Sequence, residues 1–261
     1  MKKLLLLSAL LIFACTGDDS SNDDDNSIDA VLVERFGLSF IDNEPNSSTF
    51  GEQYQSVYSY NYDGNKLLNI SFQNSIVNNY TYNDNNQMSG VYNSGGDFGE
   101  ADYDNQGRIV VWTYTDVDDN PPGNPSISVA NFVYNQDGSV VQTWQGNGQT
   151  SYTFLFDQNE NITTIISTTT NGTNTEKHYT YDNKNNPFKN VLGHSFYIWL
   201  NPLDIGGFNN NVISLNGVSW SYSYDSNNYP LTIYTSGMLG SAAPNDWDYA
   251  SNINATITYK N

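Results

Sequence analysis

One phrase recurs along the chain: an aromatic residue, then Asp or Asn, then a short polar turn and an aliphatic pair. The segment YNYDGNKLLNI, residues 60–70, is one copy, and ADYDNQGRIVVW and YSYDSNNYPLTI are later copies. Asp and Asn can hydrogen-bond their own backbone, and Gly and Asn accept a positive φ, so each copy predicts a β-hairpin turn. The aromatic position before the turn is filled by Tyr62, Tyr82, Tyr103, Tyr134, Phe156, Tyr181 and Tyr224.

Side chains on either side of these turns alternate in polarity with a period of two residues. Tyr58, Tyr60 and Tyr62 share one face, whereas Ser59 and Asn61 share the other. This alternation is typical of antiparallel sheet that is buried on one side only. A flat meander of about 14–16 strands would leave its aromatic face in water. We therefore predict an all-β fold, in which a large antiparallel meander curls into a barrel or a strongly bent sheet.

One region breaks the rhythm. In residues 187–211, Pro187 and Pro202 bracket an apolar stretch that predicts one short helical or irregular insert. Because loops and inserts often carry function, this segment could be a plug or lip at the barrel mouth. The alternative, which we favour, is a cap that covers an open end of the core.

The N-terminus has the composition of a processed leader. Residues 1–14 combine two lysines with a short apolar run, and Ala14 precedes Cys15, the one cysteine of the chain. Residues 15–27 are acidic and contain no apolar residue beyond Cys15, which predicts a disordered tether. Residues 28–261 then form a single β domain, which is long enough to bury a sizeable core.

Two stretches carry a resemblance to known families. Residues 12–15, IFAC, resemble the lipobox of bacterial lipoproteins, which implies that Cys15 receives a lipid anchor. The Ser/Asp-rich run after Cys15 is similar to the export signal of Bacteroidota surface lipoproteins. That likeness implies an outer-membrane protein facing the cell exterior.

The repeated phrase resembles the YD repeats of Rhs-type proteins. YTYDNKNNPFKN, residues 179–190, is similar to a segment of Bacteroidota lipoproteins of unknown function, a domain family with a porin-like β fold. The chain departs from the pattern at Tyr82 and Tyr134, which precede Asn, and at Pro230, where other copies carry an aliphatic residue. A true membrane porin would show the same alternation, but its lipid-facing Tyr hydroxyls and the non-aromatic end TITYKN argue against insertion.

The charge of the chain restricts its partners. The formal net charge is −19, with 28 acidic residues against nine Lys and Arg. A polyanion of this kind repels nucleic acid and anionic lipid headgroups. The lipid at Cys15 would therefore hold the protein to the membrane, and a glycan or a surface protein is the candidate partner.

Groups suited to catalysis are few. His178 and His194 belong to no metal-binding motif, so we expect neither a metal, a cofactor nor a catalytic residue. The paired carboxylates Asp102 and Asp104 keep a glycan hydrolase as a third hypothesis, although Asp104 is already explained by its turn. The acidic residues 116–119 lack the Gly and Glu of an EF-hand, which favours a solvated loop over calcium binding.

Five tryptophans remain as candidates for stacking on sugar rings. Trp112, Trp144 and Trp220 share the phase of the tyrosines, which predicts that they belong to the core. Trp199 and Trp247 lie in segments that permit exposure, so they are the candidate ligand-binding residues. The sequence thus favours a non-catalytic structural or binding role, with a glycan or small-ligand module as the alternative.

Overall fold

The wall of the molecule is one antiparallel sheet. A computed structural model describes residues 30–42, 50–117, 125–145, 150–172, 174–193, 209–235 and 250–260. Among these residues there are 17 strands and no helix. The first nine are β1 (Val33–Asp42), β2 (Gln53–Asp63), β3 (Lys66–Phe72), β4 (Ser75–Tyr82), β5 (Met88–Asn93), β6 (Phe98–Tyr103), β7 (Ile109–Asp116), β8 (Ser126–Tyr134) and β9 (Val140–Gln145). The others are β10 (Ser151–Phe156), β11 (Ile162–Thr168), β12 (Asn174–Tyr181), β13 (Val212–Leu215), β14 (Val218–Ser219), β15 (Ser221–Tyr224), β16 (Pro230–Thr235) and β17 (Ala250–Tyr259).

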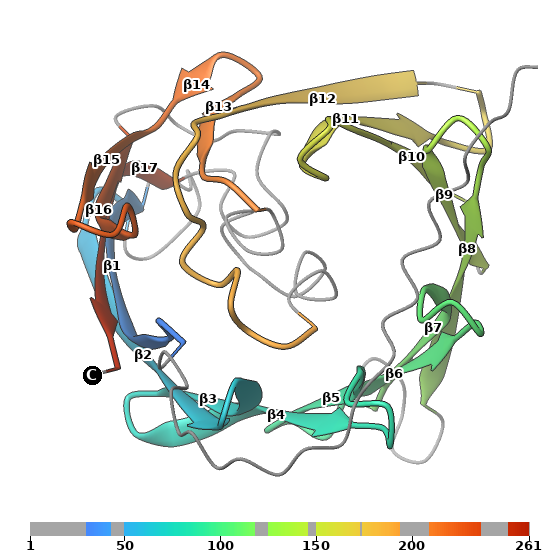
Figure 1. Cartoon of the computed structure of the whole chain (residues 1–261), viewed down its shortest axis with the longest axis horizontal. Coiled ribbons are helices and arrows are strands. Elements are labelled where there is room, and N and C mark those ends of the chain that lie inside the picture. Colours follow the sequence, from blue (N-terminus) through green and yellow to red (C-terminus); the bar gives the residue numbers. More distant parts are fainter. Residues whose placement is uncertain are drawn as a thin grey trace, which may run out of the picture.

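The meander curls into a nearly closed barrel, as predicted. Each strand from β2 to β13 pairs with the next strand in sequence, and β15 pairs with β16. Strand β17 pairs with both β16 and β1, and β1 also pairs with β2. Trp220 separates β14 from β15, and its backbone N–H donates to the Ile213 carbonyl at 2.9 Å. Figure 1 looks down the resulting ring. Closure leaves the sheet without a free edge between its first and last strands.

The aromatic face of the sheet lies inside the barrel. The predicted core residues Trp112 and Trp220 are 8% and 6% exposed, and Trp144 packs against the same cluster. In β17, Ile253, Ala255 and Ile257 are buried, and the residues between them are exposed. The period-two pattern therefore predicted the inward face correctly.

In most of the turns, the Asp or Asn of the repeat accepts backbone hydrogen bonds; the exceptions are Asn135, whose side chain donates to Ser139, and the two-residue turn after Asp63. The Oδ1 atom of Asp104 accepts the N–H groups of Gln106 and Arg108 at 2.9 and 3.0 Å. Gly107, three residues after Asp104, has a φ of 78° and donates its N–H back to the Asp104 carbonyl. This is a type I turn followed by a left-handed residue, a common three-residue hairpin loop. In its own turn, Asn83 Oδ1 accepts the equivalent N–H groups, those of Asn85 and Gln87, so Asn in place of Asp leaves the turn intact.

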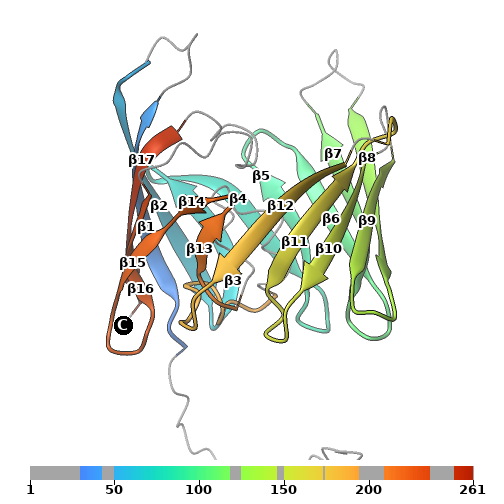
Figure 2. The same cartoon turned by 90° about the horizontal axis from the view of Figure 1, so that it is seen from above.

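The insert enters the barrel from the end that carries these turns, which we call the turn end (Figures 1 and 2). Of the predicted insert, residues 187–193 and 209–211 are described and are irregular, and residues 194–208 lie outside the described residues. Phe188 is fully buried and packs against Tyr60, with ring centroids 5.4 Å apart. Leu192 donates its N–H to the Asn65 carbonyl at 2.9 Å. The described residues thus cover part of the core at the turn end.

The opposite end of the barrel is formed by the other hairpin connections. There the β1–β2 and β7–β8 hairpins project beyond the rest of the rim (Figure 2). Phe40 stacks on Tyr54 in the first of these hairpins, with centroids 5.4 Å apart. The two ends therefore differ: the turn end is capped from inside, and the other end carries two projecting hairpins.

Candidate functional site

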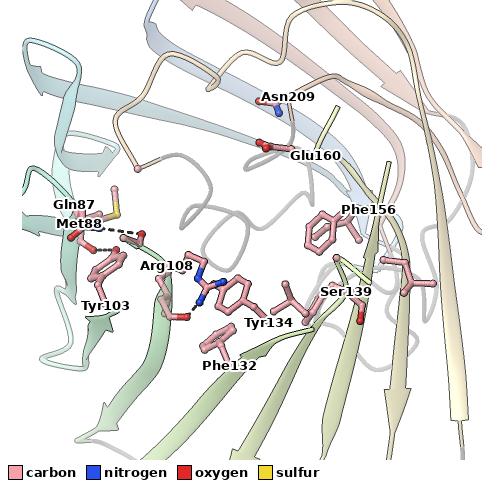
Figure 3. Close-up of a pocket in the computed structure, with 18 of the residues that line it drawn as sticks. Gln87, Met88, Tyr103, Arg108, Phe132, Tyr134, Ser139, Phe156, Glu160 and Asn209 are labelled. Atoms are coloured by element: carbon pink, nitrogen blue, oxygen red, sulfur yellow. Dashed lines mark hydrogen bonds between the residues drawn. The ribbon is translucent and has the colours of Figure 1, made fainter. Parts of the chain in front are cut away.

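A cavity of about 1020 Å³ lies at the turn end of the barrel. It is bounded by the turns that follow β4, β6, β8 and β10, and by Leu192, Gly193 and Asn209 of the insert. Its volume is at the upper limit of the range usual for small-molecule sites. Figure 3 shows aromatic rings and polar side chains from several hairpins around this space.

Tyrosine hydroxyls tie neighbouring hairpins together at the turn end. Tyr103, the last residue of β6, donates its hydroxyl to the carbonyl of Met88, the first residue of β5, at 2.5 Å. Tyr134, the last residue of β8, donates in the same way to the carbonyl of Ile109, the first residue of β7, at 3.1 Å. Tyr82 accepts the Leu67 N–H at 2.9 Å. We call this set the tyrosine ladder; its members are Tyr82, Tyr103, Tyr134, Tyr181 and Tyr259.

The ladder is interrupted at the cavity. Phe156 occupies the ladder position of β10 and has no hydroxyl to donate toward β9. The pairing of β10 with β9 ends at Phe154 and Val140, so Phe156 lies beyond the last paired residue. Phe156 is 37% exposed and lines the cavity. The cavity therefore lies where two hairpins lack the side-chain tie that joins their neighbours.

The tyrosines of the cavity offer ring faces rather than acid–base chemistry. Burial raises the pKa of Tyr103 to about 12, and burial also raises the pKa of Tyr134. Both hydroxyls are already committed to backbone carbonyls. Neutral phenols held in this way position their rings for stacking, and they do not titrate near neutral pH.

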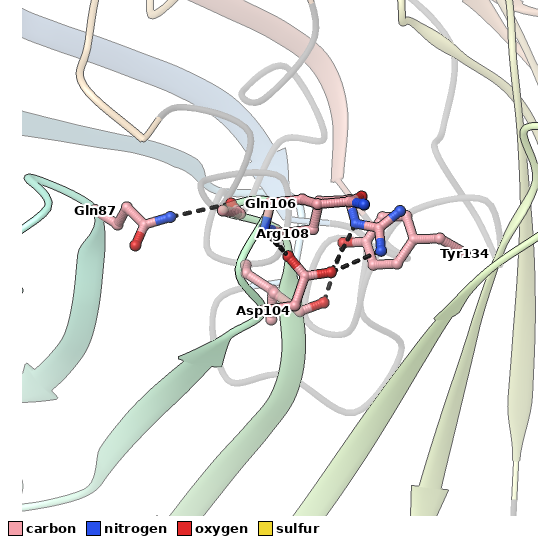
Figure 4. Close-up of polar contacts among 7 residues, drawn as sticks. Gln87, Asp104, Gln106, Arg108 and Tyr134 are labelled. Carbon is pink, nitrogen blue, oxygen red and sulfur yellow. Dashed lines mark hydrogen bonds and ion pairs between the residues drawn. The ribbon is translucent and has the colours of Figure 1, made fainter.

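Arg108 is held between a carboxylate and an aromatic ring (Figure 4). Its Nε and Nη2 atoms donate to Asp104 Oδ2 at 2.8 and 2.6 Å. Its guanidinium carbon lies 4.4 Å from the centroid of the Tyr134 ring. The Arg108 backbone N–H, and then its side chain, lower the pKa of Asp104. The pair is half-exposed, so it gives a fixed polar surface rather than much stability.

Glu160 lies on another side of the cavity, with Asn209 (Figure 3). It has a φ of 62°, the left-handed position of the turn that starts at Asp157. In the other turns of this form the same position is filled by Asn86, Gly96, Gly107, Gly138 and Asn228. A left-handed conformation is costly for a residue other than Gly or Asn. Glu160 is therefore a departure from local backbone preference in the wall of the cavity.

The other candidate groups of the sequence lie outside the residues that line the cavity wherever the structure describes them. Within the described part of the chain, no three His, Cys, Asp or Glu side chains come together to hold a metal ion. His178 points outward, as expected, and its Nε2 lies 3.1 Å from Glu176. Asp104 is engaged by its turn and by Arg108, and Asp102 is exposed on β6.

Several predicted residues lie outside the described residues. These are the leader, Cys15 and its tether, His194, and the candidate ligand-binding residues Trp199 and Trp247. Asp116 ends β7, and the other acidic residues of that loop, Asp118 and Asp119, also lie outside the described residues. Over the residues that are described, no helix has the length and apolar character needed to cross a membrane.

The residues of the cavity were not predicted as a site. Two signals in the sequence mark it: Phe156 where its counterparts are Tyr, and Glu160 where its counterparts are Gly or Asn. Both departures fall in one hairpin. Neither could be interpreted before the structure showed that the tyrosines bond the preceding hairpin and that the Gly and Asn residues have a positive φ.

Comparison with known proteins gives a match in structure alone. No known family model and no curated protein matches the chain. A porin-like protein from Bacteroides uniformis superposes with a TM-score of 0.53 at 10% identity, over 87% of this chain and 98% of that one. The two proteins share a fold.

Two other solved structures match less well. A porin-like protein from Bacteroides vulgatus gives a TM-score of 0.47 at 12% identity, over 88% of this chain and 99% of that one. The TcdB2-TccC3-Cdc42 structure gives a TM-score of 0.26 at 13% identity, over 71% of this chain and 13% of that one. The porin-like β fold expected from the repeat is thus supported by the Bacteroides uniformis protein.

Proposed function

We propose that this protein is a lipid-anchored, non-catalytic barrel that binds a small ligand in its turn-end cavity. The cavity carries the proposal because it combines ring faces with fixed polar groups. The rings of Tyr103 and Tyr134 are held by hydroxyl bonds, and Arg108 is held by Asp104. Such a set can stack on a sugar or a similar ring and bond its hydroxyl groups without much reorganisation.

The polarity of the wall supports a barrel that stands in water. Ser221 and Ser223 of β15 are exposed, and Tyr222 and Tyr224 between and beyond them are half-buried inside. In β17, Thr256 and Thr258 are exposed on the outer face. A barrel wall in contact with lipid would require an apolar band where these hydroxyl residues lie. The anchor at Cys15 would then hold the protein to the outer membrane, with the domain facing the cell exterior.

The start of the domain bears on its orientation. Strand β1 begins at the turn end, because Arg35 near its start pairs with Ser59 near the end of β2 (Figure 2). The 15 steps from Cys15 to Ala30 can span at most about 50 Å. Anchoring at Cys15 would therefore attach the tether to the domain at its turn end. Replacing Cys15 by Ala should release the protein from the membrane fraction; a variant that stays there contradicts the anchor.

Calorimetric titration of the purified protein against a panel of oligosaccharides tests the binding proposal. We expect a saturable heat, with affinity about tenfold weaker in Phe156→Ala because one ring of the cavity is lost. Phe50→Ala is the matched control, since Phe50 is 60% exposed and lies outside the residues that line the cavity. No saturable heat across the panel, or equal losses in both variants, would overturn the proposal.

A further inference from the structure

We propose that the ligand of the turn-end cavity carries a positively charged amino group, which is recognised by Glu160. This inference rests on the proposed function, because it names the chemical class of the ligand for the same site. It is carried by the charge balance of the cavity wall, by the place of Glu160 in its turn and by the aromatic rings nearby.

The cavity wall has an excess of negative charge. Arg108 is the one cation among the described residues that line the cavity, and Asp104 already pairs with it. Three further carboxylates, Asp137, Asp157 and Glu160, also line the space. No cation among the described residues pairs with them, so the cavity attracts a ligand of positive charge.

Two of those carboxylates are occupied by neutral donors. Asp137 Oδ1 accepts the N–H and the hydroxyl of Ser139, at 3.0 and 2.7 Å. Asp157 accepts bonds from the turn that it closes and from the Asn161 amide. Both side chains therefore have local roles in their turns, although each keeps its charge.

Glu160 differs from these two because no described residue bonds or pairs with its carboxylate. It also occupies a backbone position that Gly or Asn fills in the corresponding turns. Gly or Asn would fit this backbone position better, so the side chain is what distinguishes Glu160 from its counterparts in the other turns. A free carboxylate at the edge of a cavity is the natural partner of an ammonium group.

The aromatic rings of the cavity favour the same class of ligand. The face of an aromatic ring attracts a cation that lies within about 6 Å of its centroid. Phe156 is partly exposed to the cavity, and the hydroxyl of Tyr103 is turned away to the Met88 carbonyl. Glu160 lies in the turn that follows Phe156 in the chain, and both residues line the cavity (Figure 3).

A matched pair of probes tests the inference: glucosamine oligomers and the same oligomers with their amines N-acetylated. At low salt we expect the amine form to bind the full protein about tenfold more tightly. The preference should shrink at 1 M salt, where screening acts within about 3 Å. Glu160→Gln should lose most of the preference, and Glu160→Asn, which suits the left-handed backbone, should lose it equally. Glu176→Gln, on the exposed outer wall, should retain it.

The outcomes separate the two proposals. Equal binding of the amine and acetylated forms overturns the charge inference and leaves the binding site in place. A preference that survives in both Glu160 variants overturns the role of Glu160. Absence of binding by both probes, together with no response to the oligosaccharide panel, overturns the proposed function itself.

Discussion

Single hydroxyl groups join the hairpins of this barrel to one another. The hydroxyl of each member of the tyrosine ladder forms a hydrogen bond with the backbone of the preceding hairpin. A Tyr-to-Phe change therefore removes this bond between hairpins and keeps the aromatic ring. For Tyr103→Phe we expect a loss of about 1 kcal/mol in the free energy of unfolding. Tyr58→Phe is the control, because the Tyr58 ring packs on Phe72 and no described residue bonds its hydroxyl. Denaturant unfolding measures both; equal losses would contradict the ladder.

The positive φ of Glu160 should lower the free energy of unfolding. Glycine has no Cβ to oppose a positive φ, so Glu160→Gly should raise the free energy of unfolding by about 1 kcal/mol. Gln158→Gly, in the same turn but outside the positive-φ positions, should bring no gain. Thermal unfolding of the two variants gives the comparison, and a destabilised Glu160→Gly would remove the argument that the residue is kept for its side chain.

The inward orientation of the aromatic residues could be predicted from the sequence, whereas the partners of their hydroxyls could not. The Met88 and Ile109 carbonyls that accept from the ladder lie beside register shifts in their hairpins. A bulge adds one residue to a strand and leaves no clear mark in a short alternating pattern. The sequence therefore showed Phe in place of Tyr at position 156, but it did not show that a cavity lies there.

At the scale of elements, several hairpins rely on the side-chain oxygen of the residue that starts the turn. Asp225 Oδ1 accepts the N–H groups of Asn227 and Tyr229, both at 2.8 Å. Asp225→Ala leaves both donors without this acceptor, so we expect a loss of about 1–2 kcal/mol. Asp225→Asn keeps the oxygen and should lose much less, as Asn83 shows in its own turn. Chemical denaturation distinguishes the two variants, and equal losses would mean that the charge matters rather than the turn.

The insert marks the limit of prediction at this scale. Its irregular character and its covering role at the turn end were expected from the prolines and the apolar stretch. Its long-range partners could not be, since they lie far away in sequence: Asn190 Nδ2 donates to the Val31 carbonyl and to the Tyr229 hydroxyl. Such contacts follow from closure of the barrel, which a local pattern does not specify.

At the scale of the whole molecule, the buried phenols should make the folded protein less stable at alkaline pH. Burial raises the pKa of Tyr82 and of Tyr103 from 10.0 to about 12, and it raises the pKa of Tyr62, Tyr222 and Tyr259 as well. The folded state thus holds protons that the unfolded chain releases near pH 10. Their contribution to stability is complete below that pH and is lost as the pH rises to about 12.

Thermal unfolding should therefore shift to lower temperature as the pH increases from about 10 to about 12. The double variant Tyr82→Phe/Tyr103→Phe removes two of these groups, so its decline with pH should be shallower than that of the unmodified protein. Circular dichroism follows the unfolding, and tyrosinate absorbance reports the ionisation. Identical slopes in the two proteins would show that other groups control alkaline unfolding.

The central claim is that a ligand binds in the cavity at the turn end. Hydrogen–deuterium exchange of the protein, with and without a saturating oligosaccharide from the panel, tests it most directly. We predict slower exchange in the turns that line the cavity, at residues 83–87, 104–108, 135–139 and 157–161. Protection confined to the projecting β1–β2 and β7–β8 hairpins would place the ligand at the opposite end and contradict the account.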